Sequence, residues 1–478
     1  MATKKMVTDV DLDAAVQAEI NDTGSLSRGA LNATIDARAV KVSEAPLDPR
    51  RYGATFDGVT DDTTALRDAF AALPASGGTI ALRGGKAVTK RILLNGKTNT
   101  TVIFDQAELV ASAAAPDTGA GDAGVALTIA NCTDLDLRNV HINGNRANIA
   151  SQASGSTNRG VQVALKISSS TRVQVNNPRI LEAVQDGIAG STNKQVTITN
   201  PVMENIGESG IYFSTGSEDI AIIGGTFKNT GASGDWGNVV QFRNDCQRIS
   251  IVGLVSKKSY GGITFTEGIT DASVVGFVGH EMGIPVAINS AGTLNPVNKR
   301  IKITGSEFYA SATPRAAASS TVDDFHILGT DFYGAFIALG SFDTFVDSTV
   351  DGFNPGAGLA ALNLKAKARV LGSTVRNITG RGIEVQGAGA AVFDTRFDTL
   401  SDLAIRILAA GTTFRHGRNR FTGVTGGPLF DSTTDSLGGD LFRPAVAASA
   451  LGALSKKQEI FDDNGVSLGF IPIYTSIT

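Results

Sequence analysis

The stretch between Gly160 and Gly427 repeats one pattern of apolar and polar positions about eleven times. Each copy has a small residue, then apolar residues that alternate with polar ones, then a turn and a second apolar pair. Seven of the ten intervals between copies are 22 or 23 residues, and the other three are longer, as insertions at a turn would make them. The copies start at Gly160, Gly187, Gly210, Val239, Gly262, Ile284, Pro314, Ile337, Leu359, Gly382 and Ala404.

This period predicts a solenoid, and the alternation within each copy makes it a β-solenoid in which each copy is one coil. Side chains alternate between the faces of a strand, so Ile211 and Phe213 would point into the core and Tyr212 outward. A single coil cannot bury its own apolar face, so we expect stacked coils about 4.8 Å apart. The predicted fold is all-β, a single-stranded parallel β-helix with about 22–23 residues per coil.

The first 45 residues predict helices rather than strands. A first helix would carry a narrow apolar stripe formed by Leu12, Val16 and Ile20, and a second helix would follow it. Such a stripe is typical of an attachment or oligomerisation element. A plain linker arm is the alternative.

The last segment predicts a β-hairpin, because Asn464-Gly465 stands between two apolar stretches. A lone hairpin is marginal in water, so we expect its strands to pack against the same segment of other subunits. The predicted domains are 1–45 for the helical attachment or oligomerisation segment, 46–430 for the β-helix, and 431–478 for the C-terminal trimerisation or tip segment.

Composition restricts the function classes. The 478 residues carry a formal net charge of −4, which gives no case for nucleic acid as a partner. No apolar run approaches 18 residues and the first residues lack a signal-peptide core, so neither a membrane span nor a secretory signal is predicted. The four histidines are scattered and no cofactor motif is present, so no metal or cofactor is predicted. Cys132 and Cys246 are predicted to be buried free thiols.

The most specific motif runs from Arg51 to Leu66 and contains Asp57-Gly-Val-Thr-Asp-Asp62. Thr60 suits the N-cap of a helix, and Asp61 and Asp62 would lie in its first turn, where carboxylates interact favourably with the helix dipole. The helix would cover the first coil and protect it from edge-to-edge pairing. The three acids are therefore interpreted as structural. The apolar face of this helix would comprise Ala65, Leu66, Ala69, Phe70 and Leu73.

This motif resembles the opening of the pectate-lyase-like superfamily, in which an aromatic-Gly-Ala step precedes Asp-Gly-x-Thr-Asp-Asp-Thr and a helix. The resemblance covers the motif, the strand from Gly77 to Leu82 and the repeat, about 375 residues. It implies a right-handed parallel β-helix of the kind common among bacteriophage tailspikes and exopolysaccharide depolymerases. The sequence from Leu82 to Gly85 departs from the Pro-rich turn usual in that family. The ending from Gly469 to Tyr474 is similar to the C-termini of phage minor tail proteins.

The resemblance implies a homotrimeric virion protein of a phage tail, outside the host cell and joined to other tail or baseplate proteins through its N-terminal segment. Its expected partner is a bacterial surface polysaccharide. Two functions stay open, a glycosidase-type depolymerase and a non-catalytic receptor-binding or structural minor tail protein. The alanine- and serine-rich sequence beyond residue 284 favours the second. The glycan, the host and the stereochemistry are not predicted.

Candidate catalytic and binding residues lie in the coils from Gly187 to Glu267. Asp186, Glu208 and Asp235 occupy turns of three successive copies, and paired carboxylates perform glycoside hydrolysis. Nearby positions carry groups that bind sugars by stacking, hydrogen bonding or charge, and the predicted substrate-binding residues are Tyr212, Trp236, Gln241 and Arg243.

Coil spacing gives a conditional mechanism. Asp186 and Glu208, one coil apart, would lie near the separation of about 5–5.5 Å used by retaining glycosidases, whereas Asp186 and Asp235 would approach the upper end of the inverting range. One carboxyl would act as the acid, with its pKa raised by its neighbour. Ordinary polar turns are the alternative for each acid. A lyase would instead need a base, for which the candidates are Arg243, Lys257, Lys258 and Tyr260.

Overall fold

The computed structural model divides the chain into two compact units, Met1–Val202 and Met203–Thr478, and each is described by itself. Among the described residues the one α-helix is α3 (Thr63–Ala71), and strands dominate. The predicted helical segment 1–45 lies outside the described residues. The structure describes residues 46–113, 125–149, 162–231, 237–289, 298–311, 322–339, 343–354, 359–408, 414–427, 429–431, 436–442, 454–461 and 467–474.

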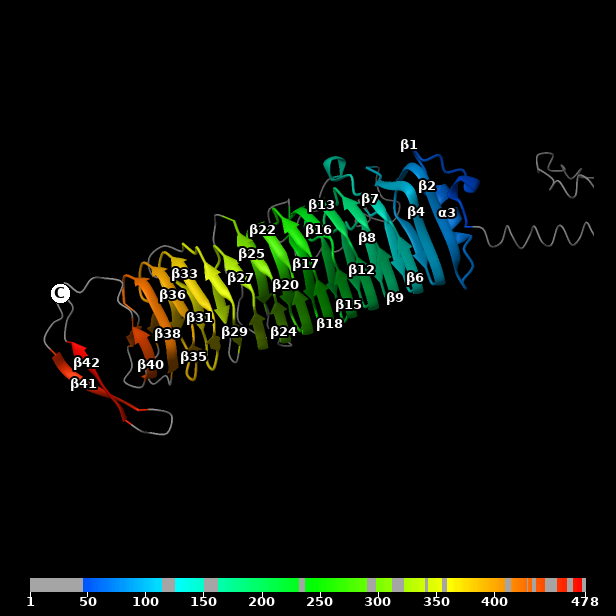
Figure 1. The fold of residues 1–478 in the computed structure, drawn as a ribbon. Coiled ribbons are helices and arrows are strands. Elements are labelled where there is room, and N and C mark those ends of the chain that lie inside the picture. Colours follow the sequence, from blue (N-terminus) through cyan, green and yellow to red (C-terminus); the bar gives the residue numbers. More distant parts are fainter. Residues whose placement is uncertain are drawn as a thin grey trace, which may run out of the picture. The chain divides into compact units, whose positions relative to one another are not determined.

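The first unit is a stack of coils whose strands pair in parallel with their counterparts one coil away (Figure 1). Ile188 pairs with Leu165 and Val196 pairs with Val173, so inward residues lie in register. Its elements are η1 (Pro49–Tyr52), β1 (Asp57–Asp61), α3, β2 (Gly78–Thr89), β3 (Ile92–Asn95), β4 (Thr98–Ala111), β5 (Leu127–Ala130), β6 (Thr133–Arg138), β7 (His141–Asn143), η3 (Arg146–Asn148), β8 (Leu165–Ser168), β9 (Thr171–Asn176), β10 (Arg179–Leu181), β11 (Ile188–Ser191) and β12 (Lys194–Thr199).

Helix α3 buries its predicted apolar face and packs against β2 and β3. The N-cap prediction is wrong, because Thr60 lies in β1 and Asp62 occupies the N-cap position. The Asp62 carboxylate accepts hydrogen bonds from the backbone N–H groups of Thr55 and Phe56, at 2.7 and 3.0 Å. It therefore ties the preceding segment to the start of the helix instead of capping the helix.

Asp57 closes a turn inside the same motif. Its carboxylate accepts from the Thr60 hydroxyl and from the N–H groups of Thr60 and Val59, at 2.7, 2.7 and 2.8 Å. These bonds, the one from the Thr60 hydroxyl first, lower the pKa of Asp57 to about 2. Asp61 accepts from the N–H of Thr63 at 3.0 Å. All three acids of the motif thus hold local backbone, in keeping with the structural interpretation.

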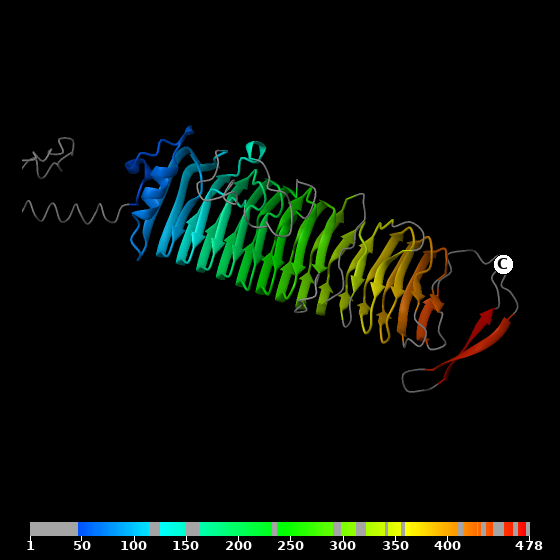
Figure 2. The ribbon, with the colours of Figure 1, turned by 180° about the vertical axis from the view of Figure 1, so that it is seen from behind.

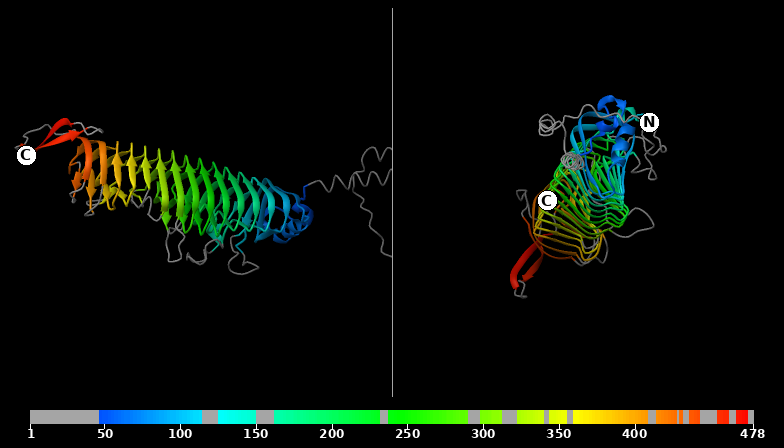
Figure 3. Two further views of the ribbon diagram at one scale, coloured as in Figure 1. Left: turned by 90° about the horizontal axis from the view of Figure 1, so that it is seen from below. Right: turned by 90° about the vertical axis from the view of Figure 1, so that its right-hand side faces the viewer.

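The second unit has the same construction (Figure 2), and Figure 3 shows its green to orange strands lying side by side. Its first coils each give one strand to a sheet that contains β14, β17, β20 and β23, and later coils give one to a separate sheet of β28, β31, β34, β37 and β39. The other strands of these coils join one larger sheet. The strands are β13 (Val202–Ile206), β14 (Ile211–Ser214), β15 (Glu218–Ile223), β16 (Thr226–Thr230), β17 (Asn238–Arg243), β18 (Gln247–Val252), β19 (Val255–Lys257), β20 (Gly261–Thr266), β21 (Thr270–Val275), β22 (Val278–Met282), β23 (Ile284–Asn289), β24 (Asn298–Thr304), β25 (Glu307–Ala310), β26 (Val322–Leu328), β27 (Asp331–Tyr333), β28 (Ile337–Leu339), β29 (Thr344–Val346), β30 (Thr349–Asp351), β31 (Ala360–Leu364), β32 (Arg369–Leu371), β33 (Thr374–Ile378), β34 (Arg381–Val385), β35 (Ala391–Phe393), β36 (Arg396–Leu400), β37 (Ile405–Ile407), β38 (Phe414–Val424), β39 (Leu429–Asp431), β40 (Ser436–Phe442), β41 (Leu454–Phe461) and β42 (Ser467–Tyr474).

The interior of the second unit is a set of apolar stacks. Phe213, Phe242 and Phe265 occupy equivalent positions of three coils, with ring centroids 6.0 Å apart at each step. All three rings are fully buried. The predicted inward orientation of Ile211 and Phe213 is confirmed, and so is the single-stranded parallel β-helix.

Some predicted starts of the repeat are wrong by a few residues. Ile188 pairs with Leu165, so the copy placed at Gly160 begins at Ala164. Ile383 pairs with Leu362, so the copy placed at Leu359 begins at Ala361. In both places a small or apolar residue a few positions earlier fits the same sequence pattern as the residue that begins the copy. The start predicted at Pro314 lies outside the described residues.

One corner of every coil needs a residue in the left-handed conformation. The first unit uses Asn139, Asn177 and Asn200, with φ between 50° and 53°, and the Asn177 side-chain amide donates to Asn139 at 3.3 Å. Asn tolerates this conformation better than most residues. The second unit uses glycine at most of these corners, as at Gly276 and Gly305. The left-handed backbone conformation at this corner is thus kept from coil to coil, while the residue that adopts it changes from Asn to Gly.

A buried hydroxyl column follows this corner in the second unit. The Ser306 hydroxyl accepts from the N–H of Phe277 in the preceding coil at 3.1 Å and donates to the carbonyl of Thr304, also at 3.1 Å. Thr330 and Ser348 repeat the arrangement in the next coils. Each hydroxyl satisfies a backbone N–H that the turn would otherwise leave without a partner.

The C-terminal hairpin is confirmed, since β41 and β42 pair antiparallel on either side of the predicted Asn464-Gly465 turn. Its packing against other subunits stays a prediction. Parallel pairing continues past residue 430, because β40 pairs with β38. Cys132 and Cys246 are buried free thiols, as predicted. Among the described residues no helix is long and apolar enough to cross a membrane.

Candidate functional site

The outer face of the β14–β17–β20 sheet carries three of the four predicted binding residues, Tyr212, Gln241 and Arg243. Tyr212, Gln241 and Thr264 pair with one another in successive coils, so they form one outward column in the second unit. They are 8, 5 and 7 % exposed. Tyr212 therefore lies on the outer face, as predicted, but most of its side chain is covered, and its role in binding a sugar stays a prediction. The alternation along a strand determines which face of the sheet a side chain points to, but it does not determine whether neighbouring residues shield that side chain from solvent.

A polar network joins this column to its neighbours. The Gln241 side-chain oxygen accepts from the Ser209 hydroxyl at 3.2 Å and from the Asn238 amide at 3.3 Å. Asn238 in turn accepts from the Thr264 hydroxyl at 2.7 Å. All four residues are buried, and buried polar groups of this kind specify one arrangement when they are satisfied. Gln241 is thus bound within the protein.

Arg243 ends the same strand and forms a two-point ion pair. Its guanidinium donates to the two carboxylate oxygens of Glu267 at 2.9 and 3.3 Å. These hydrogen bonds raise the pKa of Arg243, so its charge is fixed. The pair is half-buried and would attract a polar or anionic sugar only through the exposed edge of the guanidinium.

Glu208 lies in the turn between β13 and β14, beside this network. Its residue is 5 % exposed, and its backbone carbonyl accepts from the N–H of Gly231 at 2.9 Å. A Cβ at Gly237 would lie 2.8 Å from the same carbonyl, so the chain passes very close at this point. Glu208 is therefore a buried residue at a tightly packed point of the chain.

Asp186 belongs to the first unit and lies directly before β11. It is 2 % exposed, and its backbone carbonyl accepts from the N–H of Ala164 at 3.1 Å. The adjacent Gln185 side chain accepts from the N–H of Gln162 at 3.0 Å. The separation between Asp186 and Glu208 stays a prediction, because the two residues belong to different units. Asp235 and Trp236 lie outside the described residues.

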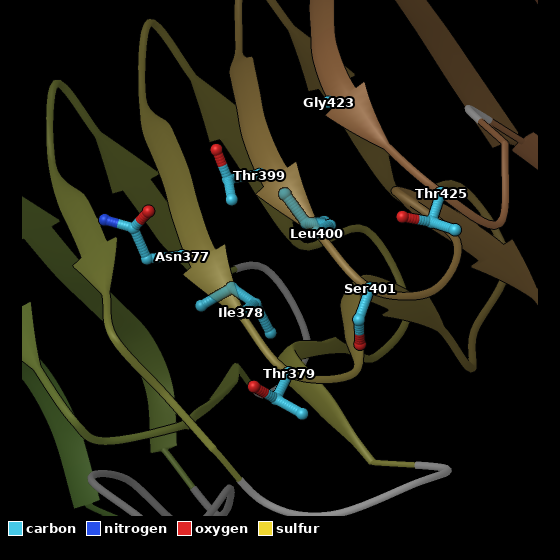
Figure 4. Close-up of a pocket in the computed structure, with 8 residues that line it drawn as sticks. All are labelled: Asn377, Ile378, Thr379, Thr399, Leu400, Ser401, Gly423 and Thr425. Carbon is cyan, nitrogen blue, oxygen red and sulfur yellow. The ribbon is translucent and has the colours of Figure 1, made fainter.

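An open cavity of about 330 Å³ lies on another face of the second unit, across the ends of β33, β36 and β38 (Figure 4). Three successive coils line it with equivalent triplets, each having a polar or small residue on either side of an apolar one. Its polar lining residues are exposed to solvent, and none of the lining residues is charged. The lining consists of Asn377, Ile378, Thr379, Thr399, Leu400, Ser401, Gly423 and Thr425.

The sequence analysis missed this cavity, although a signal was present. The triplets Asn377-Ile378-Thr379 and Thr399-Leu400-Ser401 stand one coil apart, and Gly423-Val424-Thr425 follows one coil later. Thr379, Ser401 and Thr425 place a hydroxyl at the same position of three successive coils, whereas the position before the apolar residue changes from Asn377 to Thr399 to Gly423.

A second missed feature is a stack of three surface rings. His280, Tyr309 and Tyr333 lie in successive coils with ring centroids 4.6 and 4.4 Å apart. The Tyr309 hydroxyl donates to the Glu307 carboxylate at 2.9 Å, and this bond raises the pKa of Tyr309 to about 12. The ring faces contact one another, so the edges and hydroxyls are the parts that a ligand would meet.

Within the described ranges no group of three or more His, Cys, Asp or Glu side chains could hold a metal ion. Lys257 contacts Glu281 at 3.9 Å in one exposed pair, and the Tyr260 backbone pairs with Thr230 and Ile284.

Solved structures are similar to this chain, whereas no family model and no curated protein matches it. The N-terminal fragment of bacteriophage phi29 gene product 12 is 14 % identical over 82 % of this chain and 74 % of its own, with a TM-score of 0.58. The pre-mature form of that protein has the same identity and coverage of this chain and a TM-score of 0.57, and this chain spans 59 % of its length. Tailspike protein 3 of bacteriophage CBA120 is 15 % identical over 97 % of this chain and 74 % of its own, with a TM-score of 0.50.

This chain has the right-handed parallel β-helix fold. At these identities the likeness shows the fold alone, and a fold of this kind carries many activities. Function therefore has to be argued from the β-helix surfaces themselves.

Proposed function

We propose that this protein is a phage tail-associated β-helix protein that binds a bacterial cell-surface polysaccharide. The cavity across β33, β36 and β38 supports this most directly. The hydroxyls of Thr379, Ser401 and Thr425 recur at the coil spacing, which suits a ligand that is itself a repeating chain of hydroxyl-bearing units. The absence of charged side chains from its lining favours an uncharged stretch of the glycan.

The fold shared with phage proteins supports a place in a tail, outside the host cell. In this proposal the segment 1–45 attaches the protein to other tail or baseplate components, and the working form is a homotrimer. The C-terminal hairpin would then pack against its copies in the other subunits, because a lone two-stranded hairpin is marginal in water.

Depolymerisation of the glycan is the second candidate function. Asp186, Glu208 and Asp235 would be its catalytic acids, with Tyr212, Trp236, Gln241 and Arg243 binding the substrate. The burial of Asp186 and Glu208 at 2 and 5 % exposure favours the non-catalytic function, because a catalytic carboxyl has to reach the glycosidic bond.

A glycan-release assay separates the two functions. Purified protein is incubated with capsule and cell-wall polysaccharides of candidate hosts, beside Asp186→Asn and Glu208→Gln variants. Binding without release of reducing ends supports the receptor-binding function. Release that is lost in a folded variant supports the glycosidase, and release that survives in both contradicts the acid assignment. Absence of both binding and release on every glycan contradicts the proposal.

A further inference from the structure

Basic side chains gather in the coils from β31 to β38 of the second unit. The segment from Leu359 to Gly427 contains ten lysine and arginine residues and four aspartate and glutamate residues, a formal charge of +6 in a chain whose net charge is −4. Such a local excess raises the concentration of anions near the surface and speeds their association. The arrangement of the individual arginines indicates where an anion binds.

Several arginines of the larger sheet pair with a carboxylate one coil earlier. Arg376 donates to Asp351 at 2.9 Å, and Arg418 donates through two nitrogen atoms to Asp394 at 2.8 Å each. Opposite charges on neighbouring strands stabilise a sheet. The other pairs of this kind are Arg172 with Asp134, Arg248 with Asp219, and Arg300 with Asp271.

Arg396 and Arg420 break this pattern. The parallel pairing of β36 with β38 makes them register partners in adjacent coils, and both are exposed, so two positive side chains stand side by side. Like charges opposite each other on neighbouring strands destabilise a sheet. The same column continues with Thr374 on one side and Leu441 on the other, so its next positions offer no acidic residue to either arginine.

Only one of these two charges has a carboxylate partner among the described side chains. Arg396 donates to Asp398 on its own strand at 2.8 Å, and 60 % of its side chain remains exposed. Arg420 forms no ion pair with any side chain that the structure describes. The pair therefore has an uncompensated positive charge. A carboxylate or a phosphate meets guanidinium groups through parallel, charge-assisted hydrogen bonds.

The two arginines lie close to the cavity across β33, β36 and β38. Arg396 stands three residues before Thr399, and Arg420 stands three residues before Gly423. Thr399 and Gly423 both line the cavity (Figure 4). Three residues of a strand span about 10 Å. A polymer that leaves the cavity along these strands therefore passes over Arg396 and Arg420.

We propose that Arg396 and Arg420 form a subsite for an anionic group of the glycan, a carboxylate or a phosphate, beside the uncharged stretch that the cavity holds. This inference rests on the proposed binding of a polysaccharide and specifies the chemistry of that ligand. The bound anion compensates the like charges that the chain places side by side. The uncharged cavity lining and the neighbouring arginines together select a glycan that combines neutral and acidic units.

Binding of one polysaccharide in three forms tests the inference on the full chain. The polymer that wild type retains is used untreated, with its carboxyl groups reduced to alcohols, and with its phosphate groups removed. At low salt, Arg420→Gln should bind the untreated polymer about tenfold more weakly than wild type, because it loses hydrogen bonds to a charged group. Wild type should bind one of the two treated forms with a similar loss, which identifies the anion as carboxylate or phosphate. Equal binding of all three forms by wild type would overturn the subsite.

Arg415→Gln is the matched control, because it removes the same charge from the same strand. Arg415 is also exposed and forms no ion pair with a described side chain, but it pairs with Ala391 of β35 on the other side of the corner. Its substitution should leave binding within about twofold of wild type, since exposed charges further away are screened by salt. Equal losses in Arg415→Gln and Arg420→Gln would reduce the effect to net charge and overturn the subsite.

Stability separates a binding role of Arg420 from a structural one. Arg420→Gln removes a like-charge neighbour, so its melting temperature at low ionic strength should equal or exceed that of wild type. A lower melting temperature that accompanies the weaker binding would contradict the proposal. Binding that Thr399→Trp abolishes and Arg420→Gln leaves unchanged would overturn the subsite alone, whereas the absence of binding to every glycan would contradict the proposed function as well.

Discussion

The guanidinium of Arg300 donates two hydrogen bonds to the carboxylate of Asp271 in the preceding coil, at 2.5 and 2.8 Å. Arg248 bonds in the same way to Asp219, again one coil earlier. All four residues have a positive φ and form one outward column, so acidic and basic side chains alternate along it. Opposite charges therefore meet at each coil step.

Reversing one charge should disturb this alternation. Asp271→Arg would place three guanidinium groups at successive coils with Arg248 and Arg300 on either side. We expect a lower melting temperature at low ionic strength that recovers in part in 0.5–1 M salt, since salt screens exposed charges. Asp271→Asn is the control and should lose less stability, with a weaker salt response. Equal, salt-independent losses in both variants would contradict the electrostatic explanation.

Acid should remove the contribution of these pairs. The hydrogen bonds from Arg300 lower the pKa of Asp271, and those from Arg172 lower the pKa of Asp134. Because the folded pKa values lie below those of the unfolded chain, the contribution is present above about pH 4 and is lost as the pH falls below it. Wild type should therefore lose more stability than Asp271→Asn between pH 4 and pH 2.5 in denaturant titrations. Parallel pH curves for the two proteins would contradict this.

The buried hydroxyl column predicts a sharp difference between two substitutions. Ser306→Ala leaves the N–H of Phe277 without its acceptor inside the protein, which should cost about 1–3 kcal/mol in the free energy of unfolding. Ser306→Thr keeps the hydroxyl and should be close to neutral, because Thr330 occupies the equivalent position one coil later. Urea unfolding followed by circular dichroism gives both values. A Thr variant as unstable as the Ala variant would point to packing instead of hydrogen bonding.

The left-handed corners predict which residues can replace glycine. Gly276 has φ +63° and open space around its missing Cβ, so conformation alone limits the position. Gly276→Val should destabilise the protein by at least about 1–2 kcal/mol, whereas Gly276→Asn should cost clearly less. Asn177 already holds the corresponding corner in the first unit. The comparison is again made by urea unfolding, and similar losses for Val and Asn would refute the conformational argument.

Much of the fold could be predicted because the core of a β-helix is periodic. Ile211 and Phe213 had to point inward, since residues alternate along a strand and each coil must bury one apolar row. The copies at Gly160 and Leu359 were misplaced because several small or apolar neighbours fit the start of a strand equally well. For the copy placed at Gly160, the starting residue follows only from the pairing of Leu165 with Ile188 in the structure.

The candidate sites were harder to predict, because the solvent exposure of an outward side chain depends on residues from other strands and turns that pack around it. The alternation of apolar and polar residues does not identify those residues. Tyr212 points outward and is still buried, and Gln241 is held by Ser209 and Asn238. The cavity depends on how turns of three coils align, so Thr399 became a candidate only once its register with Asn377 was known.

Binding to a polysaccharide tests the central claim most directly. Retention of purified protein on immobilised capsule or cell-wall polysaccharide is measured for wild type, for Thr399→Trp, which fills the cavity, and for Gln174→Trp, a control at an exposed strand position elsewhere. The account predicts saturable binding by wild type and Gln174→Trp that free polysaccharide competes away, and at least tenfold weaker binding by folded Thr399→Trp. Wild-type binding that Thr399→Trp leaves unchanged, or no binding to any glycan, would contradict it.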